Sequence, residues 1–303
     1  MSRMNFEEFK NVVVDGIREW LPESLKAASI ELQTVSKNND IRLTGLIIRR
    51  KDCNITPTIY LDGFYQKYSN GEDMSSIMKQ IAEIRVQHDS TRNYEIDSIL
   101  DFEKAKEHIM PRLVFAESNQ ENMKKRPHIL IEDLAVMFVI ELGKYEEGEA
   151  TIPLHYGIME MWGVTVEQLF KIAVENLEKA ECGTFISMNQ VLASLTGDNE
   201  LLENADGIPE DGMFILTNKN KVNGAGMVLD KHMMKSVIEK VGENFYMLPS
   251  SIHEWIIVPD KMEMNTEDLE TMVREVNATQ LQEEEILGNH VYHYTIENGL
   301  KIA

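Results

Sequence analysis

Apolar residues recur along the chain at two spacings, which divide it into helices and strands. The first stretch has the helical spacing, with an N-cap at Asn5 and a stop at Pro22. Alternating residues in 29–37 and 41–50 predict a hairpin with its turn at 37–40, and 54–61 supplies a third strand. Helices are expected in 62–71, 74–87 and 95–108. This part of the chain is therefore expected to be one helix, a small antiparallel sheet and further helices.

From residue 111 onward the apolar runs are longer and strands predominate. Strands are expected in 112–118, 130–142, 150–154 and 182–188, and helices in 155–162, 166–180 and 189–195. The segments 130–142 and 150–154 form a hairpin, and so do 213–219 and 226–230. Asp230 and Asn265 are expected to cap two helices, and 289–303 closes the chain as a strand pair.

The densest apolar stretch is 243–260, ENFYMLPSSIHEWIIVPD. Its two apolar runs are separated by Pro249, Ser250 and Ser251, which predicts two strands joined by a tight link. The runs are continuous rather than alternating, which is typical of strands covered on both faces. We therefore expect this pair at the centre of a sheet.

Together these patterns predict an α+β fold in which helices pack on antiparallel sheets. A boundary near residue 110 would separate a small N-terminal module, 1–110, from a larger C-terminal α+β domain, 111–303. One continuous domain is the alternative, because 303 residues fit either arrangement.

Composition narrows the class of protein. Hydrophobic residues make up 43% of the chain and charged residues 27%, which suits a globular protein with a sizeable core. No apolar run approaches the length of a membrane span, and the N-terminus has no apolar signal-peptide core, so a cytoplasmic protein is expected. Cys53 and Cys182 are far apart and without metal-ligand spacing, which indicates reduced thiols.

The net charge of −21 is unevenly distributed along the chain. Residues 141–212 carry 15 acidic and three basic residues, and 241–303 carry 12 and three, whereas 1–140 are nearly balanced and 213–240 are net positive. Such a field repels nucleic acid and anionic membranes and favours a basic protein partner. Solubility alone is the alternative explanation of this charge.

The order of five segments resembles a known family. They are EDLAVMFVIEL, WGVTVEQLFKIAVENLEK, VNGAGMVLD, ENFYMLPSSIHEWIIVPD and a terminal VYHY, with LPSSIHEWIIVP, 248–259, as the most specific. The chain is identified as resembling an uncharacterised Firmicutes family, domain of unknown function number 5688, from Phe6 to Tyr294. That resemblance implies a frequent setting in integrative conjugative elements, but no activity, cofactor or site residue.

The candidate catalytic side chains lie mainly in the central stretch, 243–260. Ser251, His253 and Glu254, with His155 from another segment, could assemble a hydrolase site, since a serine nucleophile needs a base and an acid that orients it. Adjacent residues in a strand point to opposite faces, and no G-x-S-x-G elbow is present. A turn at Ser250 and Ser251 with hydrogen-bonded polar neighbours is the favoured interpretation.

Other candidates carry weaker signals. His290 and His293 have a spacing that argues against shared ligation in a strand, and a site from His155, His253 and His293 would need a further carboxylate. The loop with Lys219, Lys221, Gly224 and Gly226 lacks a phosphate-binding motif and is expected to be a hairpin turn. The 18 methionines are expected mainly in the core. Neither a metal nor a cofactor is expected.

The sequence therefore favours a non-enzymatic acidic accessory protein of the cytoplasm that binds another macromolecule, and an association with a mobile genetic element is expected from the resemblance. The expected partner is a basic protein, and neither direct nucleic acid binding nor membrane binding is expected. A hydrolase built around His253, Glu254 and Ser251 is the alternative. The oligomeric state is left open.

Overall fold

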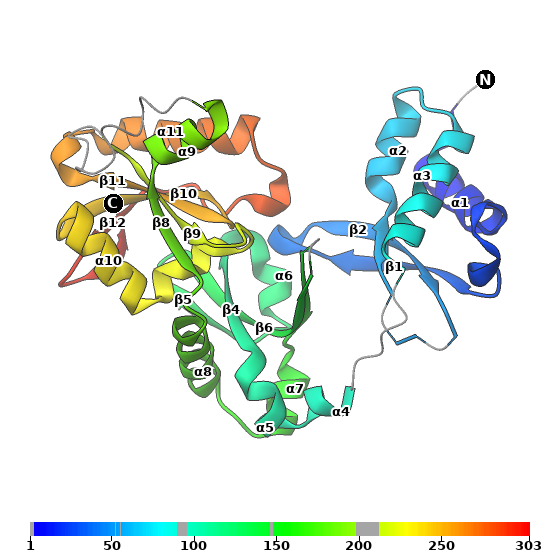
Figure 1. Cartoon of the computed structure of the whole chain (residues 1–303), viewed down its shortest axis with the longest axis horizontal. Coiled ribbons are helices and arrows are strands. Elements are labelled where there is room, and N and C mark those ends of the chain that lie inside the picture. The colour runs from blue at the N-terminus through cyan, green and yellow to red at the C-terminus, as the bar shows by residue number, and fades with distance from the viewer. Residues whose placement is uncertain (1–2, 52, 55, 90–95, 146–147, 198–211) are drawn as a thin grey trace. The chain divides into compact units, whose positions relative to one another are not determined.

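The computed structural model describes residues 3–51, 53–54, 56–89, 96–145, 148–197 and 212–303 (Figure 1). Contacts divide the chain into two compact units, one of Met1–Lys37 and Ile41–Ile96 and the other of Asn38–Asp40 and Asp97–Ala303. The contact boundary falls at residues 96 and 97, and the domain boundary proposed near residue 110 stays a prediction. Most of the acidic segment 197–212 lies outside the described residues.

The first unit packs helices on one face of a three-stranded antiparallel sheet of order β1-β2-β3. Its elements are α1 (Phe6–Trp20), a 3₁₀ turn η1 (Glu23–Leu25), β1 (Ser29–Ser36), β2 (Arg42–Arg49), β3 (Thr58–Tyr60), α2 (Leu61–Ser69) and α3 (Met74–Gln87). The expected cap at Asn5 is confirmed. Its side chain accepts a hydrogen bond from the backbone N–H of Glu8, and the Glu8 carboxylate accepts one from the backbone N–H of Asn5. Phe9, Val13 and Ile17 of α1 are fully buried in the core.

The second unit contains two antiparallel sheets. The smaller one has the order β4-β6-β5 with β7 also paired to β6; its strands are β4 (Ile109–Phe115), β5 (His128–Ile131), β6 (Leu134–Tyr145) and β7 (Gly148–Pro153). The larger one has the order β13-β12-β10-β11-β9-β8; its strands are β8 (Gly183–Ser187), β9 (Phe214–Asn218), β10 (Asn244–Ser251), β11 (Glu254–Pro259), β12 (Tyr292–Thr295) and β13 (Gly299–Ile302).

Helices and 3₁₀ turns connect these strands. The α-helices are α4 (Ile96–Leu100), α5 (Phe102–Ala105), α6 (Gln120–Met123), α7 (Tyr156–Trp162), α8 (Val166–Lys179), α9 (Met188–Thr196), α10 (Lys231–Val241) and α11 (Thr266–Thr279). The 3₁₀ segments are η2 (Asn38–Asp40), η3 (Lys106–His108), η4 (Glu117–Asn119), η6 (Gly224–Leu229), η7 (Asp260–Met262) and η8 (Glu283–Glu285). Sheets and helices in this arrangement confirm the α+β class.

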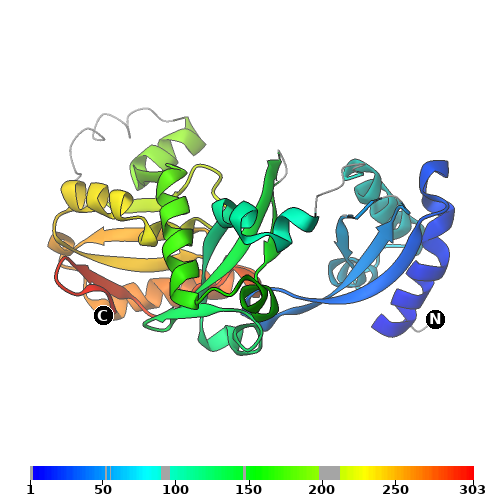
Figure 2. The ribbon, with the colours of Figure 1, turned by 90° about the horizontal axis from the view of Figure 1, so that it is seen from below.

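The expected central strand pair is confirmed as β10 and β11, which occupy the middle of the six-stranded sheet. Phe245, Met247 and Trp255 point into the main core with α10, whereas Leu248 and Val258 pack on the other face against α11. Figure 2 shows α10 and α11 on opposite sides of this sheet. Coverage of both faces explains why the apolar runs are continuous instead of alternating.

Two details of the central region differ from expectation. Pro249, Ser250 and Ser251 do not form the link between the strands, because β10 continues through Ser251 and the turn lies at Ile252 and His253. The segment 226–230 is not a strand, since η6 occupies 224–229. Gly224 lets this segment coil tightly against β9, at a position where a Cβ would not fit.

Two other expected segments are interrupted. The expected helix in 95–108 is broken into α4, α5 and η3. The expected strand 130–142 is two strands, β5 and β6, joined at Glu132 and Asp133, and Glu132 has a positive φ of 53°. Within the described part of the chain, no helix has both the length and the apolar character needed to cross a membrane.

Candidate functional site

The turn between β10 and β11 presents the imidazole of His253. Its Nδ1 accepts a hydrogen bond from the backbone N–H of Asn223 at 3.0 Å, and its Nε2 lies 3.6 Å from the carboxylate of Glu285. An accepting Nδ1 leaves the proton of the neutral ring on Nε2, facing Glu285. The hydroxyl of Thr217 also donates to the His253 carbonyl at 2.7 Å. His253 thus connects the turn to β9, to the loop before η6 and to η8.

The other hydrolase candidates have different partners. The hydroxyl of Ser251, a residue that is 5% exposed, accepts the backbone N–H of His253 at 3.1 Å. The carboxylate of Glu254 accepts a hydrogen bond from Ser250 at 3.3 Å, and His155 lies just before α7. In the part of the chain that the structure describes, no hydrogen bond joins the Ser251 hydroxyl to an imidazole. The geometry supports a structural role for this turn, and a catalytic role stays a prediction.

The same turn fixes the loop 219–226 that precedes α10. The Asn218 side chain donates to the carbonyl of Val222 at 2.7 Å and accepts its backbone N–H at 3.3 Å. The indole N–H of Trp255 donates to the carbonyl of Ala225 at 2.8 Å. A Cβ on Gly224 would lie 2.3–2.7 Å from neighbouring atoms, two of them in the backbone. The loop is therefore a fixed, glycine-dependent connection rather than the expected hairpin turn.

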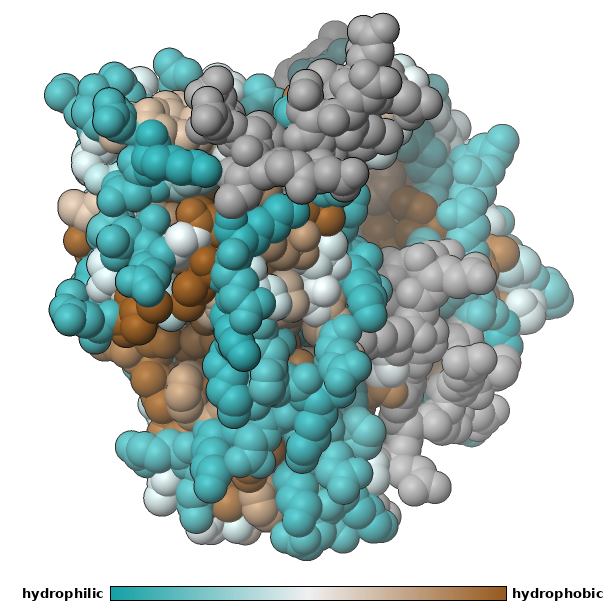
Figure 3. All heavy atoms as spheres, turned by 60° about the vertical axis from the view of Figure 1, so that its left-hand side comes forward, coloured by the Kyte–Doolittle hydropathy of each residue, from teal (hydrophilic) through white to brown (hydrophobic). Residues whose placement is uncertain are grey.

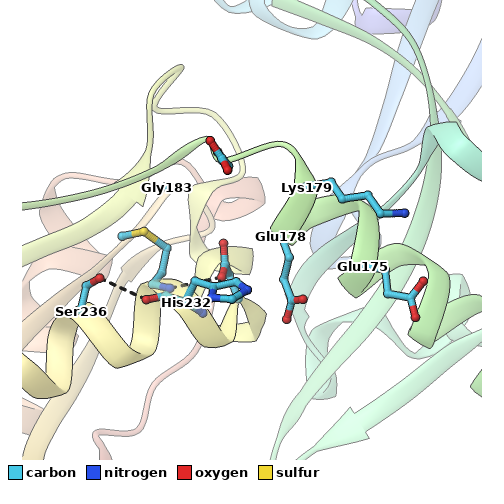
Figure 4. A pocket seen from close by; sticks show the side chains of 9 residues that line it. Glu175, Glu178, Lys179, Gly183, His232 and Ser236 are labelled. Atoms are coloured by element: carbon cyan, nitrogen blue, oxygen red, sulfur yellow. Dashed lines mark hydrogen bonds between the residues drawn. The ribbon is translucent and has the colours of Figure 1, made fainter.

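This connection leads into Asp230, the N-cap of α10. Asp230 is 2% exposed, and its Oδ1 accepts the backbone N–H groups of His232 and Met233 at 2.8 and 3.2 Å. The start of α10 faces the end of α8 and the start of β8, and a hollow of about 560 Å³ lies between them (Figure 4). Its lining residues are Glu175, Glu178, Lys179, Glu181, Gly183, Asp230, His232, Met233 and Ser236.

Four carboxylates line this hollow, which we call the acidic pocket, beside one ammonium and one imidazole. Figure 4 shows Glu178 and His232 facing each other between α8 and α10. The Glu178 carboxylate, 13% exposed, lies 3.0 Å from the ammonium of Lys231, a side chain that is 72% exposed. Lys219 donates to the carbonyl of Glu181 at 2.9 Å. The walls carry an excess of negative charge, which favours a cationic ligand.

The histidines do not converge. His290 Nδ1 lies 2.7 Å from Asp133, which also accepts a hydrogen bond from the buried hydroxyl of Tyr292. His293 Nε2 lies 4.0 Å from Asp260, on the other side of β12. Among the described residues, no group of three or more His, Cys, Asp or Glu side chains is placed to hold a metal ion.

The acidic pocket was not anticipated from the sequence. Asp230 was expected to be a cap, which is confirmed, but a cap alone gives no sign of a pocket. The overlooked signal lies in α8, where Glu175 and Glu178 lie near the C-terminal end and Glu181 follows it. A helix dipole makes this end favourable for cations and unfavourable for carboxylates. Acidic residues concentrated there are unusual for stability alone.

The comparisons with known proteins define the family without giving an activity. No curated protein matches the chain, and no solved structure matches it. A family model described as a family of unknown function, DUF5688, matches residues 6–295. That match spans nearly the whole sequence and both units, including the expected motif at 248–259 and the walls of the acidic pocket. The chain therefore belongs to the family of unknown function DUF5688.

Proposed function

We propose that this protein is a binding protein whose second unit receives a basic segment of a partner protein in the acidic pocket. The observation that carries the proposal is the mostly buried Glu178 carboxylate, which faces a 560 Å³ hollow with three further carboxylates around it. A cation entering there meets Glu178, 13% exposed, and Asp230, 2% exposed, beside the exposed Glu175 and Glu181. The two less exposed carboxylates interact with a cation more strongly than they would on an open surface.

The end of α8 strengthens the case for a cationic ligand. Unpaired backbone carbonyls at a helix C-terminus carry partial negative charge, and Glu175, Glu178 and Glu181 add full charges beside it. Lys179 in the lining, Lys231 beside Glu178, and Lys171, 4.0 Å from Glu175, offset this charge in part. A lysine or arginine from a partner would supply the missing positive charge.

The resident ion pair suggests how a partner enters. Lys231 is 72% exposed, so its ammonium can leave Glu178 and remain in water while a partner's side chain takes its place. An entering arginine fork can take the place of the Lys231 ammonium with two parallel hydrogen bonds to the carboxylate. Figure 3 shows hydrophilic side chains interspersed with apolar areas on one face of the second unit.

Binding of a short lysine-rich peptide tests this proposal. We would measure fluorescence anisotropy of the labelled peptide with wild type, with a Glu175→Gln, Glu178→Gln variant, and with a Glu267→Gln, Glu275→Gln control. The control removes the same charge from exposed positions on α11. The pocket variant is expected to lose about tenfold or more in affinity, because two charged contacts are removed.

The control variant decides whether binding is specific. Its affinity for the peptide is expected to lie within about threefold of the wild-type affinity, because dissolved salt screens the interactions of exposed charges. An equal loss in both variants would mean that the peptide senses only the net charge. The proposal would then fail.

The proposal also covers the setting of the protein. For a non-enzymatic accessory role in the cytoplasm, linked to a mobile genetic element, the support is the family resemblance carried by the motif at 248–259. Deleting the gene from a host element is expected to change the frequency of transfer and leave growth unchanged. Unchanged transfer would contradict this part of the proposal without affecting the pocket.

A further inference from the structure

Arg126 has unusual surroundings for an arginine. Its Nε is buried and has no hydrogen-bond partner, and its side chain makes no ion pair within the described residues. Arg85 shows the ordinary arrangement: it is 2% exposed, its Nε donates to the carbonyl of Ile48 at 2.8 Å, and its terminal nitrogen lies 2.7 Å from Asp89. Burying a guanidinium nitrogen away from water without a hydrogen-bond partner costs free energy, so the burial of Arg126 calls for an explanation.

Two further basic groups lie beside Arg126. The backbone N–H of Tyr156 donates to the carbonyl of Lys125 at 3.1 Å, which holds the 125–126 segment against the start of α7. His155 immediately precedes α7 and lies within the electrostatic reach of both Arg126 and Lys125. Lys124, next in the chain, is already paired with Glu121. Lys125 and Arg126 therefore lie beside His155, at the start of α7.

Within the described residues, Arg126, Lys125 and His155 make no ion pair with a carboxylate. Burial lowers the pKa of Arg126 to about 10, whereas a neighbouring carboxylate would raise it. Burial and, after it, the charge of Arg126 also lower the pKa of His155. In a protein of net charge −21, positive groups gathered without an acidic partner are the reverse of the general pattern. Arg126 as a whole is half-buried, so part of its side chain faces water, whereas Nε itself is buried.

We propose that Arg126, Lys125 and His155 form a binding site for a single phosphate group. Phosphate carries more charge than a carboxylate and has three strong acceptor oxygens, which matches a guanidinium fork, an ammonium and an imidazole. Nucleic acid is a poor source of this phosphate, since the acidic surface repels a polyanion. The ligand is a free phosphate or a small phosphate ester.

Inorganic phosphate is the probe that tests the site. Thermal unfolding of the full chain would be followed at pH 7.5 with phosphate, acetate or chloride at matched ionic strength. Phosphate is expected to raise the melting temperature of wild type in a saturable manner, and acetate is not. A Lys124→Gln control keeps the response, because Lys124 belongs to a separate ion pair. An Arg126→Gln variant is expected to bind phosphate at least about tenfold more weakly.

A second measurement covers the case in which Arg126→Gln fails to fold. Phosphate added to wild type at constant pH is expected to shift the ring signals of His155 in the NMR spectrum and to leave those of His232 in place. An absence of this shift, an equal effect of acetate, or an undiminished phosphate response in folded Arg126→Gln would each overturn the proposal.

Discussion

At the residue scale, Trp255 shows how the apolar stretch 248–259 acts in the fold. The side chain is fully buried and donates its indole N–H to the carbonyl of Ala225. Its ring packs edge to face on Tyr292, with 5.4 Å between the ring centroids. One residue therefore fills the core and holds the loop that leads to the acidic pocket. This stretch therefore supports the segment that leads to the acidic pocket.

Trp255→Phe is expected to destabilise the second unit by about 1–3 kcal/mol, because the buried Ala225 carbonyl loses its donor and the smaller ring leaves a gap. Chemical denaturation measures this change. Trp20→Phe is the control, since Trp20 is 42% exposed, and it should stay within about 0.5 kcal/mol of wild type. Equal effects of the two substitutions would refute the role given to Trp255.

His155 gives a dependence on pH with a defined sign. Its pKa is lowered in the folded protein, so the unfolded chain binds the proton more readily below the ordinary value of 6.5. His155 therefore lowers the free energy of unfolding as pH falls from about 6.5 toward its lowered pKa. Unfolding at pH 7.5 and 5.5 should show a larger loss for wild type than for His155→Gln. The same loss in both proteins would contradict this assignment.

At the element scale, the 3₁₀ segment η6 connects the sheet to the pocket. It packs so closely on β9 that Gly224 has no room for a side chain, whereas a Cβ on Gly226 would meet nothing closer than 3.9 Å. Two neighbouring glycines in one short segment thus have opposite tolerances. Close packing, and not a general need for backbone flexibility, therefore requires the glycine at 224.

Gly224→Ala is expected to destabilise the protein by about 1–3 kcal/mol or more, because the added methyl group strikes the backbone at Asn218 and His253. Gly226→Ala is expected to be neutral or to stabilise by up to about 1 kcal/mol, since alanine restricts the unfolded chain. Urea denaturation of the two variants makes the comparison. A tolerated Gly224→Ala would show that this contact is not tight.

The elements that the sequence predicted are those governed by local signals. The caps at Asn5, Asp230 and Asn265 and the strand pair at 243–260 follow from short-range chemistry and apolar density. The turn at Ile252 was missed because Pro-Ser-Ser is a strong turn signal that the strand overrides in the folded sheet. The acidic pocket needs α8 and α10 to meet across the fold, which no local pattern encodes.

At the scale of the whole molecule, the net charge belongs to one unit. Met1–Lys37 and Ile41–Ile96 carry 13 acidic and 13 basic residues and are neutral, so the remaining 38 acidic and 17 basic residues give the second unit the entire −21. Solubility does not require such a division between the units. A charge confined to the unit with the acidic pocket fits a role in recognising a basic partner.

Salt is expected to affect the two units differently. Screening weakens repulsion among the carboxylates of the second unit, so raising sodium chloride from about 0.01 to about 0.3 M should raise its melting temperature. A rise of roughly 2–4 °C corresponds to about 1 kcal/mol in a unit of this size. Calorimetry should show no comparable rise in the neutral first unit. Equal shifts would mean that the charge division has no energetic effect.

The most direct test is to locate a bound lysine-rich peptide by NMR on the isotope-labelled full chain. We expect the largest changes in the backbone amide signals at Glu178, Gly183, His232 and Met233, and small changes on α11. These changes should saturate with peptide and weaken with salt. Changes spread evenly over the acidic surface, or centred away from α8 and α10, would contradict the assignment of the acidic pocket as the binding site.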